Sequence, residues 1–137
     1  GKMGKSEGNG IFLVDEPAVI RKKVMRAVTD AGPAQLNQKM EEPIKNLFSL
    51  LELMSPPETV EHFRSQYNNC QIRYGDLKKQ LAEDIIKFTS PIREKVQDIM
   101  DDEAYLSRVV RMGAEKARAS ASKTLKDVRE IIGFKPF

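Results

Sequence analysis

Two long stretches of the sequence repeat apolar residues at helical spacing. In the first stretch, apolar residues follow one another in steps of four or three from Leu77 to Ile99, and in the second the same steps run from Leu106 to Ile132. Because this spacing places apolar side chains on one face of an α-helix, we predict two long helices that pack against each other. Pro91 interrupts the first stretch and predicts either a kink or a restart of the helix with Ser90 as its N-cap, and the unbroken apolar spacing favours the kink. The second long helix is predicted to begin near Asp102-Glu103 and to stop at Gly133.

Three shorter helices are predicted before these two. The first has Asp15 as its N-cap and Pro17 in its first turn, and it ends near Thr29. A polar linker follows at residues 31–42, the second helix starts at Pro43, and the third starts after Ser55 as its cap. The predicted fold class is therefore all-α, a helical bundle of about five helices.

The start of the chain has a different pattern. Residues 1–10 are rich in glycine and lysine and predict a flexible loop. Ile11–Val14 is a short apolar run that predicts either one strand or a docking segment. Such a strand has no partner in this chain, which indicates that the sequence is part of a larger protein.

Composition narrows the possible classes of protein. The chain has 137 residues, of which 40% are hydrophobic, so it can build a core. It contains no apolar run near the length of a membrane span and no secretory signal, so we expect a cytoplasmic protein with no membrane partner. Cys70 and His62 are the single cysteine and histidine, and they cannot assemble a structural zinc site, so no metal site is predicted.

The strongest candidate for chemistry is the segment Lys2-Met3-Gly4-Lys5-Ser6. Two lysines three residues apart can offer two positive charges to a phosphate chain. Gly4 between them has no side chain that would obstruct a close approach. The alternative interpretation is a disordered chain end or a cloning remnant.

A second candidate is a basic stripe on the last predicted helix. Its members are Arg108, Arg111, Arg118 and Lys126. Arg108 and Lys126 are separated by five full helical turns and so lie on one line along the helix. The net charge of +3 is compatible with a polyanionic partner, and such a stripe can neutralise phosphates. The alternative interpretation is a solvated face that keeps the helix soluble.

Several of these segments resemble a known family. Lys2–Asn9 resembles the lysine-bearing signature loop of class I aminoacyl-tRNA synthetases, with Gly4 at the place of the usual serine. The tract that continues to Arg26–Asp30 is similar to tryptophanyl-tRNA synthetases. So are Gly113–Ala119 and Thr124–Arg129, so that the resemblance covers both ends of the chain.

The resemblance implies a domain organisation. Residues 1–30 would be the signature loop and the connecting helix of a catalytic domain, and residues 31–137 would be a helical anticodon-binding domain. In the family, a Rossmann-type domain that carries the tryptophan pocket precedes this loop. The isolated chain is therefore expected to be inactive and to hold no cofactor by itself.

The resemblance also implies an activity. The whole enzyme would join tryptophan to ATP, with Mg²⁺, and transfer the tryptophanyl group to its tRNA, acting as a homodimer. Lys5 and Lys2 would be catalytic, and the basic stripe would bind the tRNA. The loop residues that contact ATP would be Lys2, Met3, Gly4, Lys5 and Ser6. Two alternatives stay open: a tyrosyl-tRNA synthetase relative, and a non-catalytic helical adaptor that binds nucleic acid or protein.

Overall fold

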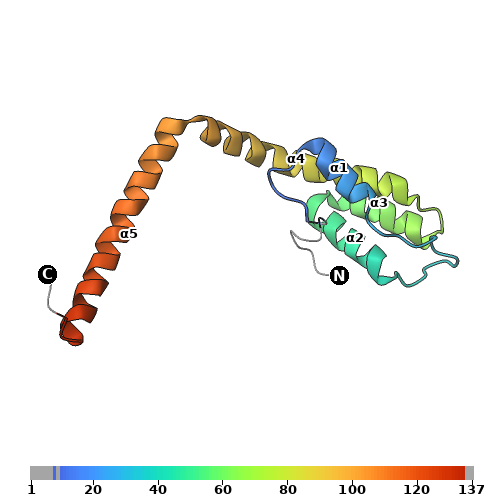
Figure 1. The fold of residues 1–137 in the computed structure, drawn as a ribbon. Coiled ribbons are helices and arrows are strands. Elements are labelled where there is room, and N and C mark those ends of the chain that lie inside the picture. Colours follow the sequence, from blue (N-terminus) through green and yellow to red (C-terminus); the bar gives the residue numbers. More distant parts are fainter. Residues whose placement is uncertain (1–7, 9, 135–137) are drawn as a thin grey trace. The chain divides into compact units, whose positions relative to one another are not determined.

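The computed structural model describes residue 8 and residues 10–134, which contain five α-helices and no strand (Figure 1). The helices are α1 (Pro17–Met25), α2 (Glu42–Met54), α3 (Pro57–Asn68), α4 (Tyr74–Asp101) and α5 (Glu103–Ile131). The all-α prediction is confirmed. None of the described helices is both long enough and apolar enough to cross a membrane.

The chain divides into two compact units, Gly1–Glu94 and Lys95–Phe137. The first unit contains the hydrophobic core, to which α1, α2, α3 and the first half of α4 contribute. The buried apolar residues are Ile20, Val24, Ile44, Leu47, Phe48, Leu51, Val60, Phe63, Tyr67, Leu77, Leu81, Ala82 and Ile85. Removal of these side chains from water is the main force that holds the four helices together.

The first helix differs from its prediction at both ends. Its N-cap is Glu16, which makes no side-chain cap bond, and it ends at Met25 rather than near Thr29. Asp15 is not the cap, because its carboxylate binds Lys23. The helix ends early where Ala27 turns its carbonyl oxygen toward Lys78 of α4. Tertiary contacts therefore outweigh the local signals here.

The start of α3 is a similar case. Ser55 is not the N-cap, because Pro56 takes that position. The Ser55 hydroxyl instead donates a hydrogen bond to Asp84 Oδ2 on α4 at 2.5 Å. The cap prediction is wrong, since a carboxylate on another helix attracts the hydroxyl more strongly than the local backbone does.

Of the two alternatives for Ile11–Val14, the strand is wrong. Ile11 packs against the core, and Phe12–Asp15 form a turn in which the Asp15 backbone N–H donates to the Phe12 carbonyl oxygen at 3.0 Å. The Asp15 carboxylate closes the turn further by accepting a hydrogen bond from the Phe12 N–H at 2.9 Å. A residue bonded to its own near neighbours in this way is not extended for strand pairing.

The structure excludes one of the two alternatives for α4 and confirms the predicted ends of α5. The helix continues through Pro91 without a restart at Ser90. The N-cap of α5 is Asp102, whose carboxylate accepts from the Tyr105 N–H at 2.8 Å. The helix α5 ends at Ile131 with Ile132 as its C-cap, and Gly133 follows at the C′ position, where φ is +75° and the Phe134 N–H donates to the Arg129 carbonyl at 2.9 Å.

The second unit buries none of its described side chains. In α5 every side chain is exposed except that of Leu106, which is partly covered. The apolar stripe of α5 therefore has no partner inside its own unit. The packing of the two long helices against each other stays a prediction.

Candidate functional site

The predicted signature loop lies outside the described part of the chain. This holds for all of its candidate residues: Lys2, Met3, Gly4, Lys5 and Ser6. The structure describes the segment that leaves this loop, from Gly10 onward. That segment lies between the predicted loop and the helical core.

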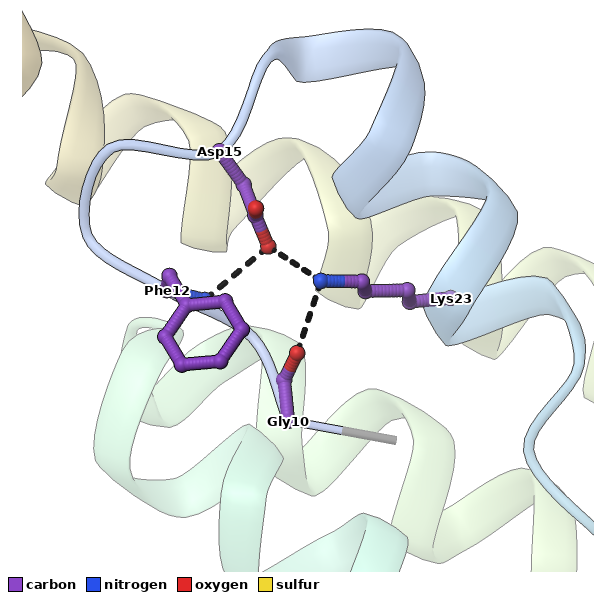
Figure 2. A network of polar contacts seen from close by, with 4 residues as sticks. All are labelled: Gly10, Phe12, Asp15 and Lys23. Atoms are coloured by element: carbon purple, nitrogen blue, oxygen red, sulfur yellow. Dashed lines mark hydrogen bonds and ion pairs between the residues drawn. The ribbon is translucent and has the colours of Figure 1, made fainter. Parts of the chain in front are cut away.

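A network of four residues holds this segment in place (Figure 2). The Lys23 ammonium group donates to the Gly10 carbonyl oxygen at 2.7 Å and to Asp15 Oδ2 at 2.6 Å. Its nitrogen also lies 4.9 Å from the centre of the Phe12 ring, within the range of a cation–π contact. Gly10, Phe12, Asp15 and Lys23 are called the Lys23 clip below.

The ion pair of the clip is largely shielded from water, whereas Phe12 is 40% exposed. The side chains of Lys23 and Asp15 are only 20% and 15% exposed to solvent. Burial acts to raise the pKa of Asp15, but the hydrogen bonds from Lys23 and from the Phe12 N–H, with the charge of Lys23, outweigh it and lower that pKa. The Asp15 carboxylate is therefore ionised at neutral pH, and the ion pair is intact.

The helix that carries Lys23 is itself bound to α4. Ile20 and Val24 enter the core, and the Arg21 guanidinium group makes two hydrogen bonds to the Glu83 carboxylate at 2.6 and 3.0 Å. The hydrogen bond from Arg21 lowers the pKa of Glu83. A second ion pair joins Arg93 of α4 to Glu16 at the start of α1. The segment that leaves the loop is thus anchored to the core through α1.

The end of α1 meets a polar cluster on α4. Lys78 is 8% exposed, and its ammonium group donates to the Ala27 carbonyl at 2.7 Å. The Tyr74 hydroxyl donates to Asp30 Oδ1 at 2.6 Å, and the Gly32 N–H donates to the same oxygen at 2.8 Å. Burial, and then the hydrogen bond to Asp30, raise the pKa of Tyr74.

Sequence reasoning did not find the Lys23 clip or the Lys78 contact. Lys23 lies in a run of basic residues, a pattern that is typical of the exposed polar face of a helix. For Lys78 the sequence contains one signal of burial, which is its position directly after the core residue Leu77. Its acceptors lie about fifty residues away in the sequence, and no local pattern indicates them.

The basic stripe lies on α5 and all of its members are exposed: Arg108, Arg111, Arg118 and Lys126. The Arg108 guanidinium group is 5.5 Å from the centre of the Tyr105 ring, and Lys126 is 3.9 Å from a carboxylate oxygen of Glu130. The stripe is therefore free to meet a large anionic partner along one side of a single helix. In the described range, no group of three or more His, Cys, Asp or Glu side chains is placed to hold a metal ion.

Comparison with known proteins decides the family. The model of the tRNA synthetases class I (W and Y) matches residues 1–90. The chain belongs to this synthetase family. The match contains both the lysine loop and the Lys23 clip.

Curated relatives of this synthetase chain cover almost its whole length. A tryptophan–tRNA ligase from Porphyromonas gingivalis is 62% identical over 135 residues, which is 98% of this chain and 41% of the relative. Tryptophan–tRNA ligase 1 from Streptomyces coelicolor is 40% identical over 139 residues, or 98% of this chain and 40% of the relative. The chain thus spans about two fifths of the length of these relatives.

Solved structures give the same result for the synthetase fold. The crystal structure of tryptophanyl-tRNA synthetase from Campylobacter jejuni matches 96% of this chain and 42% of its own chain, with a TM-score of 0.79 and 25% identity. The complex of that enzyme with ADP and tryptophan matches with the same TM-score and identity.

Proposed function

We propose that this chain is part of a tryptophan–tRNA ligase, which activates tryptophan with ATP and transfers it to its tRNA. The observation that carries the proposal is the relative from Porphyromonas gingivalis, which is 62% identical over 98% of this chain and is named tryptophan–tRNA ligase. Residues 1–30 supply the signature loop and its connecting helix, and residues 31–137 supply the anticodon-binding helices.

The lysine loop provides positive charge for the first reaction. When the bond between the α and β phosphates of ATP breaks, negative charge grows on the departing pyrophosphate. Lys5 stabilises this charge in the transition state and Lys2 assists it. Met3, Gly4 and Ser6 shape the loop, and Gly4 lacks the hydroxyl of the usual serine without removing either lysine charge.

The helices serve the second reaction by binding the tRNA. The exposed stripe of Arg108, Arg111, Arg118 and Lys126 is suited to the phosphate backbone, because these side chains share one side of α5. Their arrangement along a helix favours contact with an extended polyanion over contact with a small anion.

Substrates and setting follow from the same proposal. The complete enzyme uses ATP with Mg²⁺, binds tryptophan in a catalytic domain outside residues 1–137, acts as a homodimer and works in the cytoplasm without a membrane partner. The isolated chain is not expected to form the aminoacyl adenylate.

The two other candidates are less well supported. The family includes tyrosine enzymes, but the relatives described above are all tryptophan enzymes. An adaptor unrelated to synthetases conflicts with the family match over residues 1–90.

The proposal is tested by Lys5→Ala in the complete ligase. We expect the rate of ATP–pyrophosphate exchange in the presence of tryptophan to fall at least about tenfold, because one charge partner of the transition state is lost. The matched control is Lys39→Ala, which removes an exposed lysine from the linker and should leave the rate unchanged. An undiminished rate in Lys5→Ala would refute the role of the loop.

A further inference from the structure

The Lys23 clip controls where the chain leaves the lysine loop. Three features of the segment 10–15 converge on one ammonium group: the Gly10 carbonyl, the Asp15 carboxylate and the face of the Phe12 ring (Figure 2). An ammonium group has three N–H donors, so two hydrogen bonds and one ring contact engage it fully. The Gly10 backbone is therefore held against α1 by a lysine that has no other described partner.

The clip lies next to the segment that carries Lys5. Gly10, which accepts a hydrogen bond from Lys23, is five residues after Lys5 in the sequence. The next residue, Ile11, packs against the hydrophobic core. The clip and this core contact therefore fix neighbouring residues at the end of the predicted loop.

We propose that Lys23 and Asp15 are positioning residues for the catalytic lysine loop. They act by fixing the Gly10 end of the loop, so that Lys5 meets the departing pyrophosphate more often and from a restricted direction. This inference rests on the proposed function of Lys5. It assigns no contact with ATP to the clip itself.

The partial burial of the Lys23–Asp15 pair supports this role over that of an exposed ion pair. Exposed lysine–carboxylate pairs contribute little, because water competes for both charges. The Lys23 and Asp15 side chains are only 20% and 15% exposed, and each makes a second contact with the segment. By comparison, Lys22 on the same helix is exposed and makes no ion pair with any described residue.

The experiment is a double-mutant cycle in the complete ligase. Lys23→Met removes the charge but keeps the length of the side chain, and Lys22→Met is the matched control. We expect Lys23→Met to lower kcat for ATP–pyrophosphate exchange by about twofold or more, with the KM for tryptophan unchanged, because the end of the loop is less well positioned. Lys22→Met should match the parent enzyme, and Lys23→Arg should restore most of the rate because its guanidinium group can donate to the same two oxygens.

The decisive comparison uses the Lys5→Ala background. If Lys23 acts through Lys5, then Lys23→Met should cause no further loss once Lys5 is absent. An equal loss in both backgrounds would assign Lys23 a general structural role and overturn the inference. An unchanged rate in Lys23→Met alone would overturn it as well.

A second variant covers the case in which Lys23→Met does not fold. Asp15→Asn keeps an acceptor for the Phe12 N–H but removes the charge that pairs with Lys23. The same cycle with this variant then decides the inference by the same two criteria.

The two proposals fail in different ways. If Lys5→Ala retains the full rate, the proposed function of the lysine loop is refuted. If Lys5→Ala is slow but the Lys23 and Asp15 variants have the parent rate, only the positioning role of the clip is refuted.

Discussion

Tyr67 and Tyr74 differ in whether the hydroxyl group has a hydrogen-bond partner in the described part of the chain, and this difference decides how much the hydroxyl contributes to stability. Tyr67 is fully buried and packs edge-on against Phe48, but its hydroxyl has no hydrogen-bond partner among the described residues. Burial and the nearby Asp30 raise its pKa. Tyr74 donates to Asp30 at 2.6 Å, and burial followed by that bond raises its pKa too. No local feature of the sequence distinguishes the two tyrosines.

We expect the two phenylalanine substitutions to have different effects on stability. Tyr74→Phe removes a hydrogen bond to a charged carboxylate and should lower the free energy of unfolding by about 1 to 2 kcal/mol. Tyr67→Phe keeps the ring contact with Phe48 and removes a buried hydroxyl without a partner, so it should be neutral or slightly stabilising. Urea unfolding followed by circular dichroism measures both. Equal losses would mean that the Tyr67 hydroxyl has a partner.

At the scale of the element, α1 and α5 are stabilised in different ways. The ends of α5 follow local signals, the Asp102 cap and the Gly133 stop, which operate without distant contacts. The nine-residue α1 is too short to be stable alone and depends on α4, through Ile20 and Val24 in the core and Arg21 at the surface. The helix whose bounds were predicted well is therefore the one with the fewest tertiary contacts.

The basic stripe of α5 predicts a salt dependence of tRNA binding. Arg118→Ala should weaken binding and reduce the slope of log K against log salt by about one, because one phosphate contact is lost. Lys116→Ala is the control, since two residues along a helix place it about 200° away from Arg118. Binding to the complete ligase at several salt concentrations measures both slopes. If the two variants behave alike, α5 has no tRNA-binding side.

At the scale of the whole molecule, the first unit combines one apolar core with polar contacts that tie the lysine loop segment to α4. The ion pairs Lys23–Asp15 and Arg21–Glu83 and the bond from Tyr74 to Asp30 all involve residues within or beside α1. Hydrogen bonding lowers the pKa values of Asp15 and Glu83, whereas burial and Asp30 raise that of Tyr74. The stability of the unit should therefore depend on pH at both extremes.

We expect a stability plateau between about pH 5 and pH 9. The contributions of Asp15 and Glu83 are present above their unfolded pKa values of about 4 and are lost as pH falls through the lowered folded values. The contribution of Tyr74 is lost as pH rises above the pKa of about 10 that tyrosine has in the unfolded chain. Above this pH the unfolded chain releases the proton, whereas the folded chain, in which the pKa is raised, still holds it. Urea unfolding at pH values below, within and above this plateau measures the free energy of unfolding along the whole profile.

Two variants isolate the groups responsible for this profile. Asp15→Asn should flatten part of the acid limb, and Tyr74→Phe should flatten part of the alkaline limb. Lys22→Met leaves all three groups in place and serves as the control. If Asp15→Asn keeps the full acid slope of the parent protein, Asp15 does not contribute to acid stability in the way its contacts imply.

Much of the fold could be predicted because its signals are local. The apolar spacing indicates helices α2, α3, α4 and α5, and the start of α1 at Pro17 follows from a proline in a first turn. The failures share one cause. Asp15 and Ser55 have the side chains of helix caps, but Lys23 and Asp84 bind them instead. For the same reason the apolar run after Gly10 forms a turn and not a strand.

The sequence by itself determined the helical class, the ends of α5 and the resemblance that led to the synthetase family, because helix periodicity, caps and a lysine motif are readable over a few neighbouring residues. Only the tertiary structure decided which polar side chains pair with one another. Lys78 meets Ala27 from about fifty residues away, and Arg21 meets Glu83 from 62 residues away. Such partners are chosen by the packing of α1 against α4, which brings distant residues within hydrogen-bonding distance.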